Sequence, residues 1–126
     1  MIARTTDPNS VDFKAKFDLN DKVVVITGGS GIIGRAFCEA AAQFGAHVVV
    51  ADIPKSEPEV HAKALEEKHG RAMLGVGIDV GDKSSVEMLR EEVLKAFGKI
   101  DGLVNGHQNK THAFFEKFED YTEANW

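Results

Sequence analysis

The chain has 126 residues, enough for one domain with a hydrophobic core and too few for two. Hydrophobic residues make up 43% and charged residues 28%, an ordinary globular composition, and the net charge of −5 argues against a nucleic-acid partner. No apolar run reaches the roughly 20 residues that cross a bilayer, so no membrane partner is expected. The single cysteine, Cys38, cannot form an internal disulfide, which favours the reducing cytoplasm.

The N-terminal residues 1–16 show little periodicity, and we expect them to form an arm. Phe17 and Leu19 are apolar and are expected to hold this arm against the body. Residues 23–26 form a continuous β-branched run, which is typical of a strand buried on both faces. The folded unit is therefore expected to occupy residues 17–126.

Two βα units follow from the spacing of apolar residues. A glycine-rich turn at 28–34 precedes a first helix that Gly45 ends, with apolar residues at helical spacing: Ile33, Phe37, Ala40, Ala41 and Phe44. Residues 48–50 predict a second buried strand, which Asp52 closes. Residues 59–69 then predict a weakly amphipathic helix.

A third unit begins with a strand predicted at residues 72–78. Ser84 and Glu87 have the spacing of a capping box, in which the serine hydroxyl accepts from the third amide and the glutamate reaches back. They predict the start of a helix that has one apolar face, made of Val86, Leu89, Val93 and Phe97. A short fourth strand is predicted at residues 103–104.

This alternation predicts an α/β fold: a three-layer, Rossmann-type parallel sheet with right-handed crossovers and helices on both faces. The sequence stops at Trp126, one turn into a helix that Thr122 would cap. One helical turn is not stable alone. We therefore expect the sheet to be truncated after about four strands.

The glycine-rich loop carries the clearest chemical signal. It reads Thr27-Gly28-Gly29-Ser30-Gly31-Ile32-Ile33-Gly34 and contains G-x-G-x-x-G between a strand and a helix. Glycine tolerates positive φ, lets a pyrophosphate approach the backbone, and precedes the unpaired amides of a helix N-terminus. The loop predicts dinucleotide binding; the alternative is a glycine-rich turn without a ligand.

The acidic residue Asp52 supports the same prediction. It ends the second strand, within the loose spacing of about 20 residues from the loop. A carboxylate there accepts from both adenosine ribose hydroxyls and repels a 2′-phosphate, so NAD is the predicted cofactor, in preference to NADP. Arg35 and Lys55 are nearby cations that would soften this preference. The alternative role of Asp52 is to cap the next turn.

With these residues, Asp79-Val80 and the segment 100–105 make the chain resemble the short-chain dehydrogenase/reductase family, from about Phe17 to Trp126. The resemblance covers the first half of the family's fold, and it implies the strand order 3-2-1-4 and an absent catalytic half. It also implies a cofactor site made of Thr27, Gly28, Gly29, Ser30, Gly31, Ile32, Ile33, Gly34, Asp52, Ile53, Asp79, Val80, Asn105 and Gly106.

Within that implied site, Asp79 would contact the adenine amino group and Val80 would flank the ring. Asn105 would stabilise the central strand near the cofactor. Asp79 has the alternative of a simple turn residue, and Val80 that of a core residue.

The chain departs from the family in two places. Its glycine spacing is T-G-x-x-G-x-x-G, which occurs in some members, whereas T-G-x-x-x-G-x-G is commoner. After the fourth strand the family usually has Asn-Asn-Ala-Gly, and members that act on sugar acids or polyols have Asn-Gly-Ala-Gly. Here the segment reads Asn105-Gly106-His107-Gln108. The large side chains of His107 and Gln108 are expected to hinder binding at the nicotinamide end of the site and to leave the adenosine end intact.

No catalytic residue is predicted within the chain. The family uses an Asn, a Ser and a Tyr-x-x-x-Lys motif, but the only tyrosine is Tyr121 and Asn125 stands four residues after it. Whether the chain is an enzyme by itself therefore stays open. His107 and His112 have no third ligand nearby, so no metal is predicted. Cys38 is expected to be packed rather than reactive.

Three functions remain open at this stage. The first is the NAD-binding portion of an oxidoreductase that moves hydride between NAD(H) and an alcohol or ketone, such as a sugar acid or polyol, and that is inactive as this chain. The second is a stand-alone nucleotide-binding module, completed by self-association or a partner chain through the bare edge of the fourth strand. The third is a remnant that binds nothing.

Overall fold

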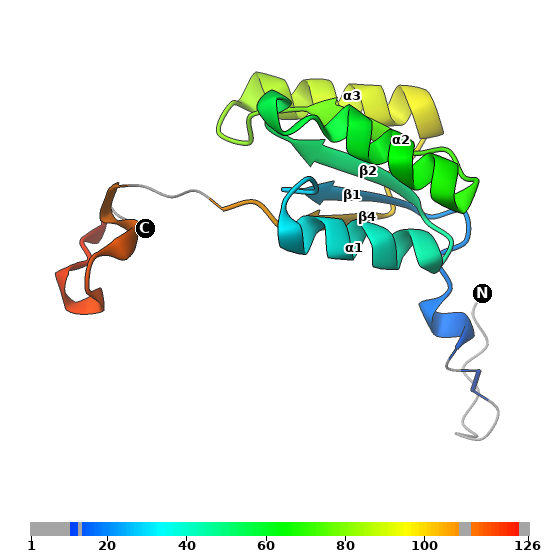
Figure 1. The fold of residues 1–126 in the computed structure, drawn as a ribbon, viewed down its shortest axis with the longest axis horizontal. Helices are drawn as coiled ribbons and strands as arrows, with labels where there is room; N and C mark the ends of the chain where they lie inside the picture. The colour runs from blue at the N-terminus through cyan, green and yellow to red at the C-terminus, as the bar shows by residue number, and fades with distance from the viewer. Residues whose placement is uncertain (1–10, 13, 109–111, 124–126) are drawn as a thin grey trace.

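The computed structural model describes residues 11–12, 14–108 and 112–123. A parallel sheet in the order β3-β2-β1-β4 forms its centre, and Figure 1 shows helices above and below it. The strands are β1 (Val23–Thr27), β2 (His47–Asp52), β3 (Leu74–Gly77) and β4 (Gly102–Asn105). The helices are α1 (Ile32–Gln43), α2 (Pro58–His69) and α3 (Lys83–Phe97). The predicted fold class and strand order are confirmed.

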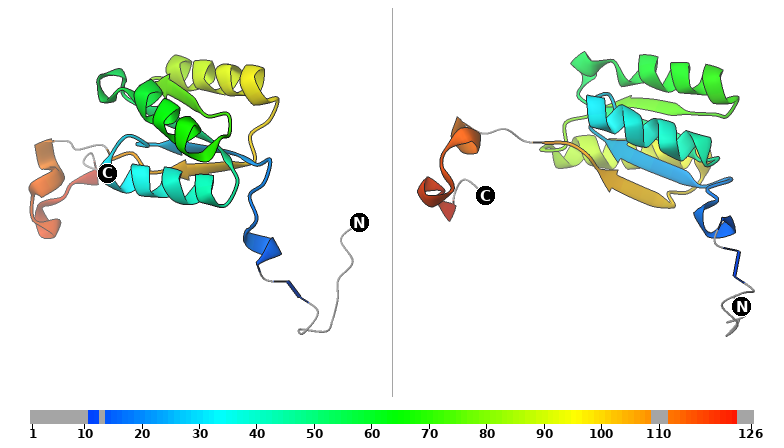
Figure 2. Two further views of the ribbon diagram at one scale, coloured as in Figure 1. Left: turned by 45° about the vertical axis from the view of Figure 1, so that its right-hand side comes forward. Right: turned by 60° about the horizontal axis from the view of Figure 1, so that its bottom comes forward.

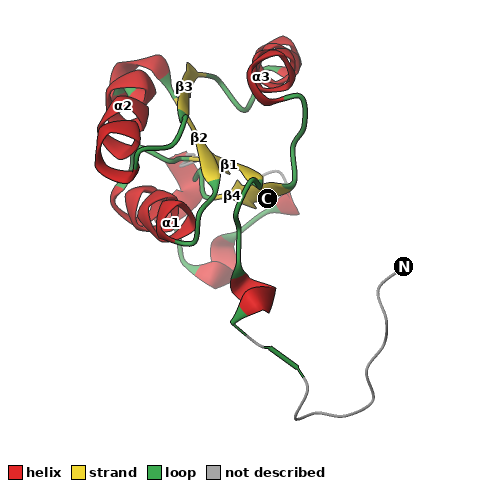
Figure 3. Cartoon of the chain, turned by 90° about the vertical axis from the view of Figure 1, so that its right-hand side faces the viewer, coloured by secondary structure: helices red, strands yellow, loops and turns green. Residues whose placement is uncertain are grey.

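The three layers follow from the burial of both faces of the sheet. Alternate residues of β2 point to opposite sides: Val48 and Val50 lie in the cluster under α1 and α2, whereas Val49 and Ala51 lie in the cluster under α3. All four are fully buried. Figure 3 shows α1 and α2 together on one side of the strands and α3 on the other. A continuous apolar run is what such a doubly covered strand requires.

The buried face of α1 differs from the apolar stripe seen in the sequence. The helix places Gly34, Cys38, Ala41 and Ala42 against the sheet. The large apolar residues of the stripe turn outward, with Ile33 70%, Phe37 45% and Phe44 53% exposed. Small side chains let the helix axis approach the strands closely, so residue size rather than hydrophobicity decides which face packs.

Two predicted boundaries are corrected. The strand predicted at residues 72–78 is shorter, Leu74–Gly77, because only these residues pair with β2. The capping box at Ser84 is wrong: the N-cap of α3 is Asp82, whose Oδ1 accepts from the backbone nitrogen of Ser84 at 3.0 Å. Asp82 is extended, as an N-cap must be, whereas Ser84 already lies inside the helix.

The segments beside the sheet contribute little to the core. Leu19 packs against the cluster under α1, but Phe17 is 65% exposed, so the prediction that it holds the arm is wrong. Figure 2 shows the 3₁₀ turns at His112–Phe115 and Phe118–Asp120 lying apart from the sheet. The helix predicted after Thr122 falls mostly on residues 124–126, which are outside the described residues. In the described part of the chain, every helix is too short or too polar to span a membrane.

The thiol of Cys38 is buried in α1, and its Sγ donates to the carbonyl oxygen of Gly29 at 3.7 Å. Burial raises the pKa of this thiol to about 11. Because only the thiolate reacts, we expect a disulfide reagent at pH 8 to modify Cys38 at least about tenfold more slowly in the folded chain than in urea. The measurement is the rate of thiol release by absorbance, with the urea-unfolded chain as control. Equal rates would show that the thiol is accessible.

Candidate functional site

The turn between β1 and α1 brings the glycine loop against the end of β4. Gly28 has φ +67°, a conformation that L side chains rarely adopt, and a Cβ built there would lie 2.6 Å from the carbonyl oxygen of Gly106. The two loops are therefore in direct backbone contact. Glycine at position 28 is required both by the turn and by this contact.

The loop also sits tightly under α1. A Cβ on Gly34 would collide with the backbone carbonyl oxygen of Gly28. Gly31 is the N-cap of α1 and supplies no side-chain hydrogen bond to the helix. The first amides of the helix therefore have no capping acceptor from the N-cap side chain.

Asp52 joins the end of β2 to this loop. Its Oδ2 accepts from the backbone nitrogen of Ser30 at 3.0 Å, and its Oδ1 accepts from the backbone nitrogen of Ile53 at 2.8 Å. The second bond is the local turn contact that was the alternative reading of this residue. The first bond reaches across 22 positions and fixes the carboxylate beside the glycine loop.

A cavity of about 340 Å³ lies where the carboxyl ends of the strands meet these loops. It is lined by Gly28, Ser30, Gly31, Asp52, Ile53, Ser56, Ile78, Asp79, Val80, Gly106, His107 and Gln108. The structure thus brings together predicted residues from the ends of all four strands. In α/β sheets of this kind, this edge is where ligands bind.

Some predicted site residues do not line the cavity: Thr27, Gly29, Ile32, Ile33, Gly34 and Asn105. Thr27 and Asn105 are paired in register at the ends of β1 and β4. Ile32 is 94% exposed in the first turn of α1. The cavity also includes Ser56 and Ile78, which the sequence analysis missed. Ser56 lies in the 3₁₀ turn after β2 (Pro54–Ser56), and a scan of every loop that follows a strand would have found it.

Asp79 and Val80 form the rim of the cavity on the β3 side. The Oδ1 of Asp79 accepts from the backbone nitrogen of Gly81 at 2.8 Å, so this residue does shape a turn. Its own backbone nitrogen donates to Ser85 Oγ at 3.0 Å. Val80 is 40% exposed, which excludes the alternative that it belongs to the core. Both residues stand at the wall of the same cavity as Asp52.

His107 is tied to the end of β1. Its Nδ1 lies 2.8 Å from Thr27 Oγ1, and the same hydroxyl accepts from the backbone nitrogen of Gly106 at 3.2 Å. These contacts hold the imidazole at the wall of the cavity that Asp52 also lines. The side chain of His112, the other histidine of the considered metal pair, lies outside the described residues.

Within the described part of the chain, the buried hydroxyl of Ser30 lacks a hydrogen-bond partner, and this is independent evidence for a polar ligand at the cavity. The residue is 7% exposed, and its hydroxyl is the one buried side-chain oxygen or nitrogen, among the described residues, without a hydrogen-bond partner. A buried hydroxyl without a partner costs free energy. Ser30 lines the cavity, so a polar ligand group there would satisfy it.

Comparison with known proteins gives consistent matches. A family model described as short chain dehydrogenase matches residues 22–126. An NAD-dependent glycerol dehydrogenase of Listeria innocua is 33% identical over 114 residues, covering 90% of this chain and 42% of that protein. The L-sorbose reductase of Gluconobacter frateurii, solved with NADPH and L-sorbose, has a TM-score of 0.73 at 33% identity, covering 87% of this chain and 41% of that one. A short-chain dehydrogenase/reductase from Burkholderia phymatum, solved with NAD, has a TM-score of 0.63 at 35% identity, covering 68% and 30% respectively.

The chain belongs to the short-chain dehydrogenase family of oxidoreductases, which confirms the resemblance drawn from its motifs. It spans about two fifths of the length of the glycerol dehydrogenase and the sorbose reductase. One solved relative holds NADPH and the other holds NAD. Both forms of the nicotinamide dinucleotide thus occur among the solved relatives.

Proposed function

We propose that this chain is the NAD-binding portion of a short-chain dehydrogenase that moves hydride between NAD(H) and an alcohol or ketone. The observation that carries the proposal is the Asp52 carboxylate, held by the Ser30 amide at the wall of a cavity of about 340 Å³. Residues 17–126 form the proposed unit. The relatives include a glycerol dehydrogenase and an L-sorbose reductase, which favours the polyol over the sugar acid as the proposed substrate class. We further propose that the chain by itself does not turn over, because its only tyrosine lacks a lysine four residues on.

The proposed roles follow from position. The amides of the glycine loop and of the first turn of α1 would hold the pyrophosphate. Asp52 would accept from the adenosine ribose hydroxyls, while Asp79 and Val80 would contact the adenine. The Ser30 hydroxyl, which is buried without a partner, would donate to the dinucleotide. When bound, the nicotinamide group supplies the hydride-transfer chemistry.

We propose NAD in preference to NADP because of the charges around Asp52. A 2′-phosphate would meet the Asp52 carboxylate at close range. Arg35, one of the two cations expected to soften this repulsion, is already engaged: its Nε donates to the carbonyl oxygen of Ser30 at 2.9 Å, and its Nη2 lies 2.7 Å from His61 Nε2. Neither Arg35 nor Lys55 is among the residues that line the cavity.

A calorimetric titration of the purified chain with NADH, NADPH and ADP-ribose tests the proposal. We expect NADH and ADP-ribose to bind with similar affinity, because the bulky His107 and Gln108, which line the cavity, would hinder contacts with the nicotinamide. NADPH is expected to bind at least about tenfold more weakly. If none of the three binds to a folded, monodisperse sample, the proposal fails and the chain is a remnant of the family's site.

A second candidate function is a nucleotide-binding module completed by self-association. In the described residues, β4 pairs with β1 on one side only, and Leu103 within it is 59% exposed. Open strand edges with apolar side chains favour pairing with another chain. Light scattering on a size-exclusion column tests this: a discrete dimer favours the module, whereas a monomer excludes it.

Two further proposals concern where the protein is located and what it does not bind. A cytoplasmic location is proposed because the lone thiol is compatible with a reducing compartment. The net charge of −5 supports the proposal that nucleic acid is not a partner.

A further inference from the structure

A chain of hydrogen bonds links α2 to the adenosine end of the cavity. His61 Nε2 lies 2.7 Å from Arg35 Nη2, Arg35 Nε donates to the Ser30 carbonyl at 2.9 Å, and the Ser30 backbone nitrogen donates to Asp52 Oδ2 at 3.0 Å. The backbone between Asp52 and His61 connects the two ends of this chain of hydrogen bonds. The position of the Asp52 carboxylate relative to the glycine loop thus depends on contacts made by both helices.

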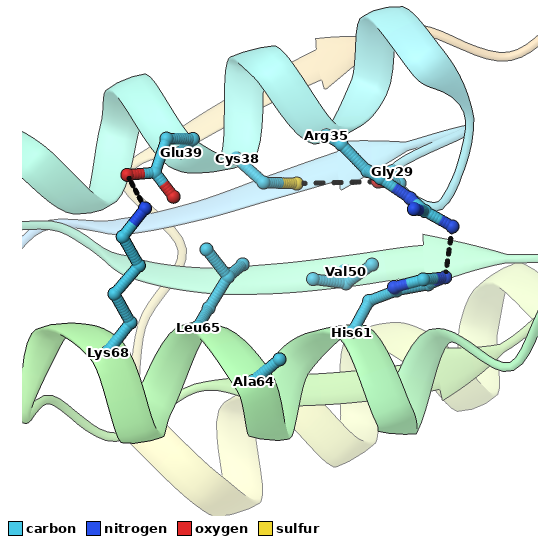
Figure 4. A pocket seen from close by; sticks show the side chains of 9 residues that line it. All are labelled: Gly29, Arg35, Cys38, Glu39, Val50, His61, Ala64, Leu65 and Lys68. Atoms are coloured by element: carbon cyan, nitrogen blue, oxygen red, sulfur yellow. Dashed lines mark hydrogen bonds and ion pairs between the residues drawn. The ribbon is translucent and has the colours of Figure 1, made fainter.

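Of these residues, Arg35 and His61 also border a separate crevice of about 200 Å³ between α1 and α2. Figure 4 shows Arg35 and His61 meeting at one end of it and Glu39 and Lys68 at the other. The middle is apolar, with Val50, Ala64 and Leu65. The Arg35–His61 contact therefore joins the two helices at the end of the crevice nearest the glycine loop, where Gly29 also lies.

The chemistry of this contact sets the protonation state of His61. A guanidinium only donates hydrogen bonds and stays charged. His61 Nε2 must therefore accept, which requires a neutral imidazole with its proton on Nδ1. A protonated imidazole cannot accept, and it would set a second positive charge against Arg35.

We infer that His61 is a positioning residue for adenosine-ribose recognition, acting as a hydrogen-bond acceptor through Arg35 and Ser30 on Asp52. The inference rests on the proposed function of Asp52. Removal of the His61 acceptor is expected to weaken NADH binding about fivefold, the effect of one hydrogen bond.

The other charged groups of the crevice have partners at its far end. Glu39 Oε1 accepts from Lys68 Nζ at 2.8 Å, this bond holds the pKa of Glu39 low, at about 2, and His69 Nε2 lies 3.2 Å from the same oxygen. β2 contributes only the uncharged Val50 to the crevice. Asp52, at the end of β2, is bonded to the Ser30 and Ile53 amides.

The experiment compares His61→Gln and His61→Leu with the wild-type chain. Glutamine offers an acceptor oxygen and does not titrate, whereas leucine offers no acceptor. We expect His61→Gln to keep most of the wild-type NADH affinity at pH 7.5 and His61→Leu to lose about fivefold. Lys68→Ala, which breaks the ion pair at the other end of the crevice, is the matched control and should bind NADH like wild type.

A second readout needs no ligand: hydrogen exchange of the Ser30 amide, which is protected by its bond to Asp52. We expect faster exchange in His61→Leu, and protection retained in His61→Gln, at the same pH. Wild-type protection and wild-type NADH affinity in His61→Leu would overturn the inference. If no variant binds NADH but Ser30 protection follows His61, the positioning role stands and the proposed function fails.

Discussion

Replacement of Gly34 by alanine is expected to destabilise the fold by about 2 kcal/mol and to abolish dinucleotide binding. The new Cβ would collide with the backbone carbonyl oxygen of Gly28, which cannot move without shifting the loop. Such overpacking against backbone costs about 3 kcal/mol, and the better helix propensity of alanine returns only about 1 kcal/mol. Urea denaturation measures the loss of stability, and calorimetry with NADH measures the loss of binding.

Gly31→Ala is the matched control, because it adds the same methyl group three residues earlier in the same loop. Its Cβ would meet only the Gly28 carbonyl oxygen, at 3.3 Å, and the backbone there has no positive φ. We expect a stability change within about 0.5 kcal/mol of wild type. If both variants unfold at the same urea concentration as wild type, the close approach of α1 to the loop is not a constraint on the fold.

Replacement of Asp52 by asparagine is expected to narrow the difference in affinity between NADH and NADPH. The amide oxygen still accepts from the Ser30 nitrogen, so the turn is preserved while the charge is removed. Hydrogen bonds to a charged acceptor contribute about 1.5–3 kcal/mol, so NADH should bind roughly tenfold more weakly. NADPH should bind more tightly than it does to wild type, because the repulsion of the 2′-phosphate is removed.

The control for this prediction is Asp79→Asn, which changes the net charge equally at another wall of the same cavity. Its Oδ1 can still accept from Gly81, so the local turn is kept. We expect Asp79→Asn to leave the ratio of NADH to NADPH affinity unchanged. A ratio that is also unchanged in Asp52→Asn would reduce Asp52 to a turn residue and would remove the basis for the NAD preference.

The same two residues show how far sequence reasoning reaches. Asp52 was assigned to the site because it ends the strand that follows the glycine loop, and strands that alternate with helices must be parallel and end at one edge. Asp79 came from the resemblance to the family. The β-branched runs at 23–26 and 48–50 determined the buried strands without any tertiary information. The strand order came from the resemblance to the family, since periodicity alone does not say which strands are neighbours.

Sequence reasoning could not identify residues that act through contacts with distant parts of the chain. The sequence marked Arg35 as a free cation near the ribose, but the structure joins it to Ser30 and to His61, which is 26 positions away. His61 itself lies in a weakly amphipathic helix and carried no signal. Such pairings depend on how α1 and α2 meet over the sheet, which no local pattern encodes.

The sequence by itself determined the strands, the glycine loop and the acidic residue after β2, because backbone propensity and burial periodicity are local properties. The tertiary structure decided the rest. It turned Ile33, Phe37 and Phe44 outward, since α1 can approach the strands closely only on its face of small residues. The N-cap of α3 is Asp82 and not Ser84, and His107 contacts Thr27. Both differences arise because hydrogen bonds form between atoms that folding brings together.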